Sequence, residues 1–105
     1  MPKYLLEVNL TLDGVRGVIA KGGSARKAAA TAAAKSVGGK VESFYFAFGG
    51  TDVYCIVDLP DNEAAAALAL AVSAGGGATT NTIVLLTDQI DTATAKKVKY
   101  TPPGA

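Results

Sequence analysis

At 105 residues, the chain is long enough for a single domain with a hydrophobic core. Hydrophobic residues make up 50% of it, which excludes a disordered chain, and the net charge of +1 gives no overall electrostatic basis for nucleic-acid binding. Histidine is absent, which excludes His-based catalytic triads and His metal sites.

The cysteine count and the absence of known motifs exclude further classes of protein. The single cysteine, Cys55, excludes an internal disulfide, and its place in a strand pattern favours a buried structural thiol over a reactive one. Without a disulfide, a signal peptide or an apolar run long enough to cross a membrane, we expect a cytoplasmic protein. The sequence has no Rossmann fingerprint, Walker loop, CxxC or HExxH motif, so we expect no cofactor and no metal.

The first part of the chain predicts a strand followed by a split helix. Residues 3–11 alternate between an apolar face and a more polar face that carries Glu7 and Asn9. After a turn, residues 15–20 predict a short helix that ends at residues 21–23. Ser24 is the expected N-cap of a second, alanine-rich helix over residues 25–37, whose small side chains allow close packing on a sheet. Gly38 and Gly39 stop this helix.

A β-hairpin is the strongest pattern in the sequence. Aromatic and β-branched residues fill residues 40–48 and 52–59, on either side of a Gly49-Gly50-Thr51 turn. The period of two places Val53, Cys55, Val57 and Leu59 on a core face, and Asp52, Tyr54, Ile56 and Asp58 on the opposite face. Pro60 ends the second strand, and Asp61 is the expected N-cap of the next helix.

The last part of the chain predicts a helix, a strand, a short helix and a tail. Residues 61–74 have almost no polar face, so we expect this helix to be buried on several sides. Three glycines end it, and residues 79–86 form the fourth strand. Thr87 and Asp88 are the expected cap of a short helix over residues 89–97, and residues 98–105 form an extended tail.

This order, β-α-β-β-α-β with the first helix split, predicts an α+β, ferredoxin-like fold with four antiparallel strands and both main helices on one face. The other face would carry Leu5, Asn9, Tyr54 and Ile56 without a cover. Because a monomer rarely exposes such an apolar area, we expect a homodimer or a higher homo-oligomer, assembled through this face or through the strand edges.

Six stretches are distributed over essentially the whole chain: Met1 to Tyr4, Gly22 to Arg26, Phe44 to Gly49, Asp52 to Tyr54, Val57 to Asn62 and Tyr100 to Gly104. Together they resemble the GYD domain family. This resemblance implies a small bacterial-type protein with a ferredoxin-like, dimeric α+β fold, and it implies no particular reaction. Where the family has its Gly-Tyr-Asp tripeptide, this chain has Gly50, Thr51 and Asp52.

One candidate site is an anion-binding corner at the start of the second helix. Its residues are Gly22, Gly23, Ser24, Arg26 and Lys27. Free N–H groups at a helix N-terminus favour an anion, which would also relieve the conflict between the two cations and the helix dipole. The alternative is that Ser24 is only an N-cap and that the cations are solvated.

Two further candidates lie on the hairpin and on the uncovered face. Asp52, with Tyr54, is either a carboxylate beside a pocket or a residue that sets the turn. The second is an open-face pocket or, alternatively, an ordinary oligomer interface; it holds Glu7, Asn9 and Tyr54 with Tyr45 or its neighbours Phe44 and Phe46.

These observations predict a small homo-oligomeric protein that binds a small molecule or an anion. The alternative is a metal-free, cofactor-free enzyme with Glu7, Asp52 or Tyr54 as the acid-base group, and the third possibility is a structural interaction module. We expect neither nucleic acid nor a membrane among its partners.

Overall fold

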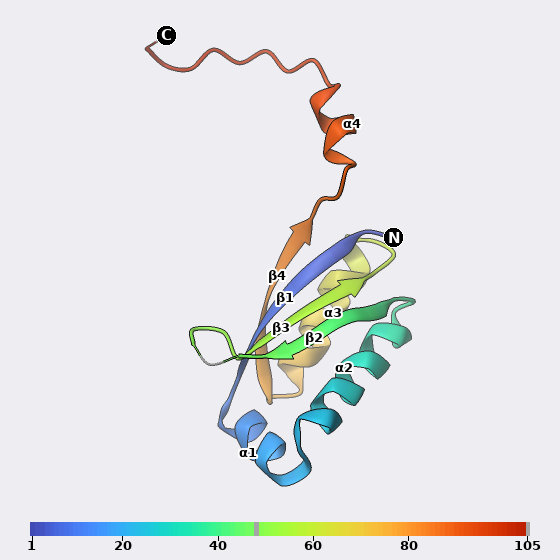
Figure 1. Ribbon diagram of the computed structural model, residues 1–105, viewed down its shortest axis with the longest axis vertical. Coiled ribbons are helices and arrows are strands. Elements are labelled where there is room, and N and C mark those ends of the chain that lie inside the picture. The colour runs from blue at the N-terminus through green and yellow to red at the C-terminus, as the bar shows by residue number, and fades with distance from the viewer. Residues whose placement is uncertain (48, 105) are drawn as a thin grey trace.

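The computed structural model describes residues 1–47 and 49–104. Its elements follow the order β1 (Lys3–Leu10), α1 (Leu12–Lys21), α2 (Gly23–Ser36), β2 (Lys40–Phe46), β3 (Val53–Asp58), α3 (Asn62–Ala74), β4 (Ala78–Leu85) and α4 (Ile90–Thr94) (Figure 1). This order confirms the predicted ferredoxin-like α+β fold with a split first helix, a short last helix and an extended tail. Phe48, which we predicted as the last residue of a hairpin strand, lies outside the described residues.

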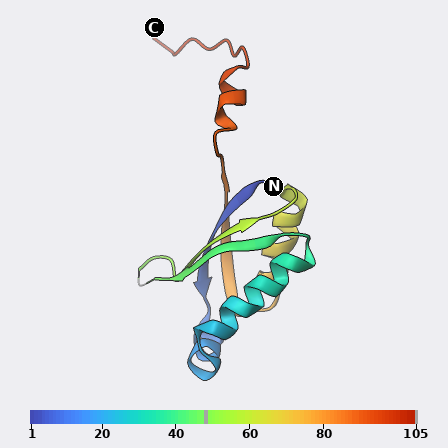
Figure 2. The same ribbon diagram turned by 45° about the vertical axis from the view of Figure 1, so that its right-hand side comes forward.

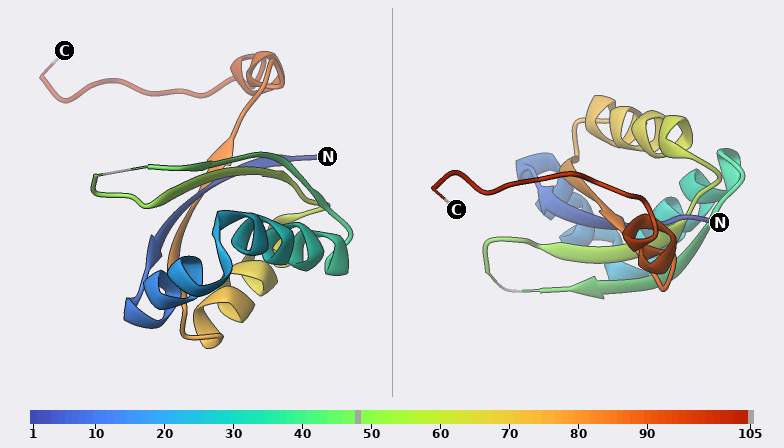
Figure 3. Two further views of the ribbon diagram at one scale, coloured as in Figure 1. Left: turned by 60° about the horizontal axis from the view of Figure 1, so that its bottom comes forward. Right: turned by 90° about the horizontal axis from the view of Figure 1, so that it is seen from above.

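The four strands form one antiparallel sheet in the order β2-β3-β1-β4. α2 and α3 lie on the same side of this sheet (Figure 3). In the register, Leu6 is opposite both Cys55 and Thr82, whereas Glu7 is opposite both Tyr54 and Asn81. Alternate residues therefore point to the helices and to the other side of the sheet, which we call the open face. The open face carries Leu5, Glu7, Asn9, Tyr45, Tyr54, Ile56, Asn81 and Ile83.

The hydrophobic core lies between the sheet and the helices. Its buried residues come from β1, β3 with its following residue, and α3; they are Tyr4, Leu6, Val53, Cys55, Val57, Leu59, Ala65 and Leu68. The predicted core face of the second hairpin strand, Val53 to Leu59 in steps of two, is thereby confirmed. Phe44 packs against the same core from β2.

The helix starts differ from the prediction at two places. α1 begins at Leu12, earlier than expected, because the Thr11 hydroxyl accepts a hydrogen bond from the Gly14 N–H at 3.3 Å and so caps the helix. α2 begins at Gly23 with Gly22 as its N-cap, so the prediction that Ser24 is the cap was wrong. Gly22 has φ +83°, a conformation that glycine adopts without steric cost, and it turns the chain from α1 into α2.

α3 is capped as predicted but is less buried than predicted. The Asp61 carboxylate accepts a hydrogen bond from the Ala64 N–H at 2.8 Å. Ala65 and Leu68 face the core, whereas Leu70 is 72% exposed, so only one side of this helix is covered within the chain. The expectation of burial on several sides is therefore wrong for the single chain.

Residues 86–104, which we call the C-terminal arm, project away from the domain (Figure 2). Every residue of the arm is exposed, including Leu86, Ile90, Val98 and Tyr100. The arm accounts for a long dimension of 57 Å and a radius of gyration of 16.8 Å, where a compact chain of this length has about 13 Å. α4 has no side-chain N-cap, so the predicted cap by Thr87 and Asp88 was wrong.

Candidate functional site

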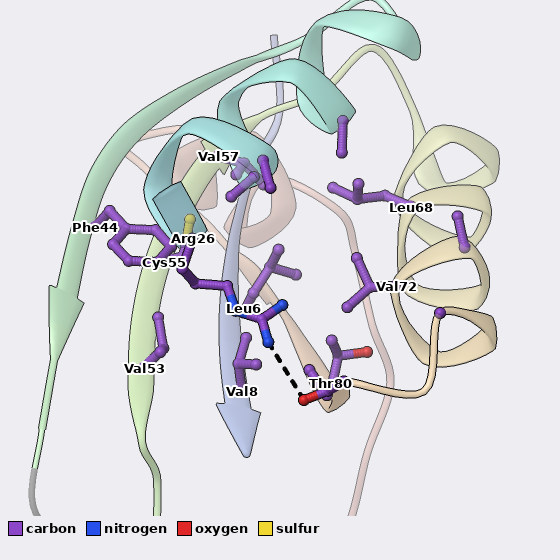
Figure 4. Close-up of a pocket in the computed structure, with 17 residues that line it drawn as sticks. Leu6, Val8, Arg26, Phe44, Val53, Cys55, Val57, Leu68, Val72 and Thr80 are labelled. Carbon is purple, nitrogen blue, oxygen red and sulfur yellow. Dashed lines mark hydrogen bonds between the residues drawn. The ribbon is translucent and has the colours of Figure 1, made fainter. Parts of the chain in front are cut away.

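A cavity of about 340 Å³ lies between the core face of the sheet and the helices α2 and α3 (Figure 4). We call it the helix–sheet cavity. Its lining residues are mostly aliphatic or small, and they come from β1, α2, β2, β3, α3, the loop after α3, and β4. They are Leu6, Val8, Arg26, Ala29, Ala30, Ala33, Phe44, Val53, Cys55, Val57, Leu68, Ala71, Val72, Gly75, Gly77, Ala78 and Thr80.

The cavity arises from where the helices rest and from how small their side chains are. α2 packs on the edge strand β2, and α3 packs on the opposite edge strand β4, so the two central strands face the space between the helices. On α2 this space is bordered by Ala29, Ala30 and Ala33, whose methyl groups leave most of it unfilled. Beyond these alanines the packing is close, because Ala34 is fully buried and a Cβ at Gly39 would overlap Leu59.

Arg26 brings a positive charge to this apolar cavity. Its guanidinium reaches the loop between α3 and β4, where Nη2 donates to the Gly77 carbonyl oxygen at 3.4 Å, the bond drawn as a dashed line in Figure 4. Among the described residues that line the cavity, Arg26 alone is charged, and no carboxylate of the described chain forms an ion pair with it. The cavity is thus apolar along its walls and cationic at one end.

The backbone around Gly77 holds this end of the cavity in place. The Gly77 carbonyl oxygen also accepts a hydrogen bond from the Thr11 N–H at 3.1 Å, and the Thr11 hydroxyl donates to the Gly76 carbonyl at 2.7 Å. Gly14 approaches so closely that a Cβ there would overlap the Gly77 carbonyl oxygen. The start of α1 and the loop before β4 are therefore fixed to each other beside the Arg26 guanidinium.

Cys55 contributes a thiol to the same cavity. It is buried on β3, and desolvation by the surrounding apolar groups raises the pKa of the thiol from 9.0 to about 11. The thiol is therefore protonated at neutral pH and is a poor nucleophile. This agrees with the interpretation of Cys55 as a structural thiol.

The residues of the predicted anion-binding corner lie on two different sides of α2. Arg26 points toward the helix–sheet cavity, whereas Ser24 and Lys27 lie on the outer surface of the helix with Thr31 and Lys35. Gly23 lies against the Phe46 ring, whose Cε2 atom would be 2.7 Å from a Cβ at this position. Arg26 and Lys27 are adjacent in sequence, but the helix separates their side chains.

Asp52 lies at the junction between β1 and the hairpin. Its Oδ2 accepts a hydrogen bond from the Leu10 N–H at 2.8 Å, and its own N–H donates to the Val8 carbonyl at 3.0 Å. Asp52 thus accepts a backbone N–H, as the turn interpretation expected, but the donor is Leu10 at the end of β1 and does not belong to the hairpin turn. Tyr54, two residues further on, is on the open face and is 41% exposed.

The predicted open-face residues form one row across the sheet. The register places Asn81, Glu7, Tyr54 and Tyr45 side by side on β4, β1, β3 and β2, and Asn9 lies two residues along β1. The Asn81 amide donates to Glu7 Oε1 at 3.0 Å. Phe44 and Phe46, which we considered as alternatives to Tyr45, are opposite Cys55 and Val53 and so lie on the core side.

Sequence reasoning missed an ion-pair cluster at the far end of the sheet. The Lys3 ammonium lies 2.9 Å from both Asp58 Oδ1 and Glu42 Oε2. The hydrogen bond from Lys3 lowers the pKa of the buried Asp58 carboxyl below 3.8, and the bonds to Glu42 and Asp58 raise the pKa of Lys3. The only indication of this cluster is that Lys3 and Asp58 face each other on paired strands, and this pairing is known only once the strand register is known.

The lining of the helix–sheet cavity was also missed as a set, although its spacing was visible. Arg26, Ala30 and Ala33 follow the i, i+4, i+7 spacing of one helix face.

Residues 1–47 and 49–104 contain no group of three or more His, Cys, Asp or Glu placed to hold a metal ion. No helix over these residues has the length and apolar character that a membrane span needs.

Comparison with known proteins agrees with the resemblance found in the sequence. A family model described as the GYD domain matches residues 4–94, a range that includes the core of the sheet and the helices α1 to α4. Comparisons with curated proteins and with solved structures gave no match. The match over residues 4–94 shows that the chain belongs to the GYD domain family.

Proposed function

We propose that this protein binds a small, predominantly apolar molecule in the helix–sheet cavity. The observation that carries this proposal is a cavity of about 340 Å³ with aliphatic, aromatic and alanine walls. Ligand pockets typically have volumes of about 300–1,000 Å³, and an apolar cavity of about 150 Å³ already accommodates benzene. The space therefore suits a molecule with two fused rings or a chain of roughly eight carbon atoms.

The hydrophobic effect favours an apolar occupant. The cavity is partly open, because Ala29, Ala71 and Gly75 of its lining are exposed, so water reaches its walls. Since water makes few hydrogen bonds to apolar walls, an apolar ligand that displaces it would gain free energy by removing apolar surface from water.

The polar groups support binding rather than catalysis. Glu7 and Asp52, the carboxylates that we considered as catalytic bases, accept hydrogen bonds from Asn81 and from the Leu10 N–H. The Cys55 thiol remains protonated at neutral pH because burial raises its pKa to about 11. A chemical step would need a free acid-base group in the cavity, and these contacts favour a structural role for each candidate.

The proposal includes a homo-oligomer in which a second copy packs on the open face. This face carries Tyr45, Tyr54 and Ile83, which are 69%, 41% and 38% exposed, together with the partly exposed Leu5 and Ile56. Two sheets that stack face to face bury such residues at a separation of about 10 Å. The row of Glu7, Asn81, Tyr54 and Tyr45 would then lie at the interface.

A neutral fluorescent probe, N-phenylnaphthylamine, tests the binding site. Its fluorescence should rise with saturation as the protein is titrated. Bound probe should also slow the alkylation of Cys55 by iodoacetamide, because Cys55 lines the cavity; the reaction is followed at about pH 9–10, since the thiol, with a pKa of about 11, is protonated at neutral pH. Alkylation of the urea-unfolded protein, with and without the probe, is the control. A probe that does not bind, or that binds without protecting Cys55, would contradict the proposed site.

Native mass spectrometry of gently purified protein tests the assembly and retained ligand together. We expect a homo-oligomer, and Tyr54→Glu should shift it toward the monomer because the new carboxylates would be buried at the interface. Thr31→Glu, on the outer surface of α2, is the matched control. A wild-type protein that is monomeric at micromolar concentration would contradict the packing of a second copy on the open face.

A further inference from the structure

We infer that Arg26 makes the helix–sheet cavity selective for apolar molecules that carry one anionic group, of the carboxylate or sulfonate class. This inference depends on the proposed function, because it specifies the ligand of the same cavity. It is based on the position and the unmet hydrogen-bonding capacity of a single side chain.

Arg26 is placed where a ligand's head group would lie. It comes from the first turn of α2, and Arg26, Ala30 and Ala33 form the face of the helix that borders the cavity. The side chain extends across the space toward Gly77 and Thr80 instead of into solvent on the outer surface, where Lys27 lies (Figure 4). A molecule that fills the apolar part of the cavity would therefore have one end beside the guanidinium.

Most N–H donors of the Arg26 guanidinium have no hydrogen-bond partner among the described residues. The guanidinium carries five N–H groups, and among the described residues it donates one hydrogen bond, to the Gly77 carbonyl oxygen at 3.4 Å. Charge-assisted bonds are usually about 2.7–2.9 Å long, so this contact is weak. A carboxylate or sulfonate could accept two parallel N–H bonds from the planar fork while the Gly77 contact persists or is released.

The charge balance sets the number of anionic groups. Arg26 is the one charged residue in the described lining, and the other polar side chains there are the Cys55 thiol and the Thr80 hydroxyl. Arg26 is partly exposed, so water solvates its charge when no anion is bound. One anionic group on a ligand would balance this single positive charge, whereas a second anionic group would have no cationic partner among the described lining residues.

Two dyes that differ by one sulfonate separate the charge from the apolar body. N-phenylnaphthylamine is neutral, and anilinonaphthalene sulfonate has the same ring system with one anionic group. We expect the wild-type protein to bind the sulfonate more tightly. Arg26→Met should weaken sulfonate binding by about 10- to 100-fold, the range for a hydrogen bond to a charged group, and should change the affinity for the neutral dye less than about threefold.

Lys35→Met is the matched control, because it removes the same charge from the outer surface of the same helix. It should leave the affinities for both dyes unchanged. Arg26→Lys keeps the charge and loses the planar fork, so its sulfonate affinity should fall between those of the wild type and Arg26→Met. Unchanged binding of the neutral dye by Arg26→Met also shows that this variant is folded.

Displacement of the sulfonate dye by octanoate and by octanol extends the test to plain carboxylates. These compounds share a chain of eight carbon atoms, so we expect octanoate to displace the dye at a concentration at least tenfold lower than octanol. Arg26→Met should abolish this preference.

The outcomes distinguish the inference from the proposed function. If neither dye binds, the proposed function fails. If the neutral dye binds and the sulfonate binds no better, or if Arg26→Met weakens both equally, the cavity binds ligands without selecting their charge and the inference is wrong. If Lys27→Met weakens the sulfonate as much as Arg26→Met, the anion is held at the outer N-terminus of α2, which also overturns it.

Discussion

Replacing Ala30 with phenylalanine places an aromatic ring where α2 borders the helix–sheet cavity. If the cavity accepts the ring, the substitution should stabilise the fold and block the ligand at the same time. Most substitutions of a small residue by a large one within a packed interior destabilise a protein by about 1–3 kcal/mol, so the sign of the effect is informative.

The magnitude follows from burial and from helix propensity. Fully burying a phenylalanine side chain contributes about 1.5–3 kcal/mol relative to leaving it exposed. Phenylalanine is a poorer helix former than alanine by up to about 0.7 kcal/mol. The net gain should be roughly 1–2 kcal/mol, which for a domain of this size raises the melting temperature by about 5–10 °C.

Ala28→Phe is the matched control, since Ala28 is exposed on the outer surface of the same helix. It incurs the propensity cost without burial, so its free energy of unfolding should fall by about 0.5 kcal/mol. Urea unfolding gives both free energies, and titration with N-phenylnaphthylamine should show that Ala30→Phe loses binding while Ala28→Phe retains it. A destabilised Ala30→Phe that still binds the probe would refute the position of the cavity.

Three further predictions concern the frame around the cavity. Asp58→Asn should be less stable than the wild type at neutral pH, because the hydrogen bond from Lys3 lowers the pKa of this carboxyl below 3.8. That stabilisation exists above the ordinary pKa and is lost as the pH falls through the lowered one, so the urea curves of the two proteins should approach each other as the pH is lowered below 3.8. A constant difference at all pH values would exclude this linkage. Gly14→Ala should lower the free energy of unfolding by about 1–3 kcal/mol, since its Cβ would overlap the Gly77 carbonyl oxygen; a neutral result in urea unfolding would mean that α1 can move aside. Deleting residues 89–105 should change the free energy of unfolding by less than about 0.5 kcal/mol, because residues 86–104 are exposed in the single chain. A larger loss of stability in thermal unfolding would show that the C-terminal arm packs on the domain or on a second copy.

The sheet could be predicted because its pattern is local and has a fixed period. In β1 and β3, every second residue is apolar and faces the core, and residues of low strand propensity, Gly49 and Gly50, separate the two hairpin strands. Asp61 was recognisable as a cap because a proline ends the preceding strand and a carboxylate precedes an apolar helix. These signals need no knowledge of which segments meet in space.

The helix starts were harder to predict, because one residue serves two helices. Gly22 ends α1 through its N–H, which donates to the Val18 carbonyl at 2.7 Å, and it is also the N-cap of α2. Ser24 looked like the cap because serine often is one, but the turn at Gly22 is complete two residues earlier. Thr11 was not predicted as a cap because we expected the first helix to begin at residue 15. Its capping role becomes visible only once α1 is known to begin at Leu12.

The helix–sheet cavity could not be predicted, because an alanine on a buried helix face has two opposite consequences. Where the helix is held close to its neighbours, alanine permits tight contact, as at the buried Ala34 beside Gly39 and Leu59. Where the helix is held over the edge strand, as at Ala30, the same side chain leaves space. The distance is set elsewhere, by the Phe46 ring against Gly23 at the start of α2 and by the close packing at its end. Composition gives the size of each side chain but not the separation of the helix from the central strands, so the same alanine run is compatible with a filled core and with a binding site.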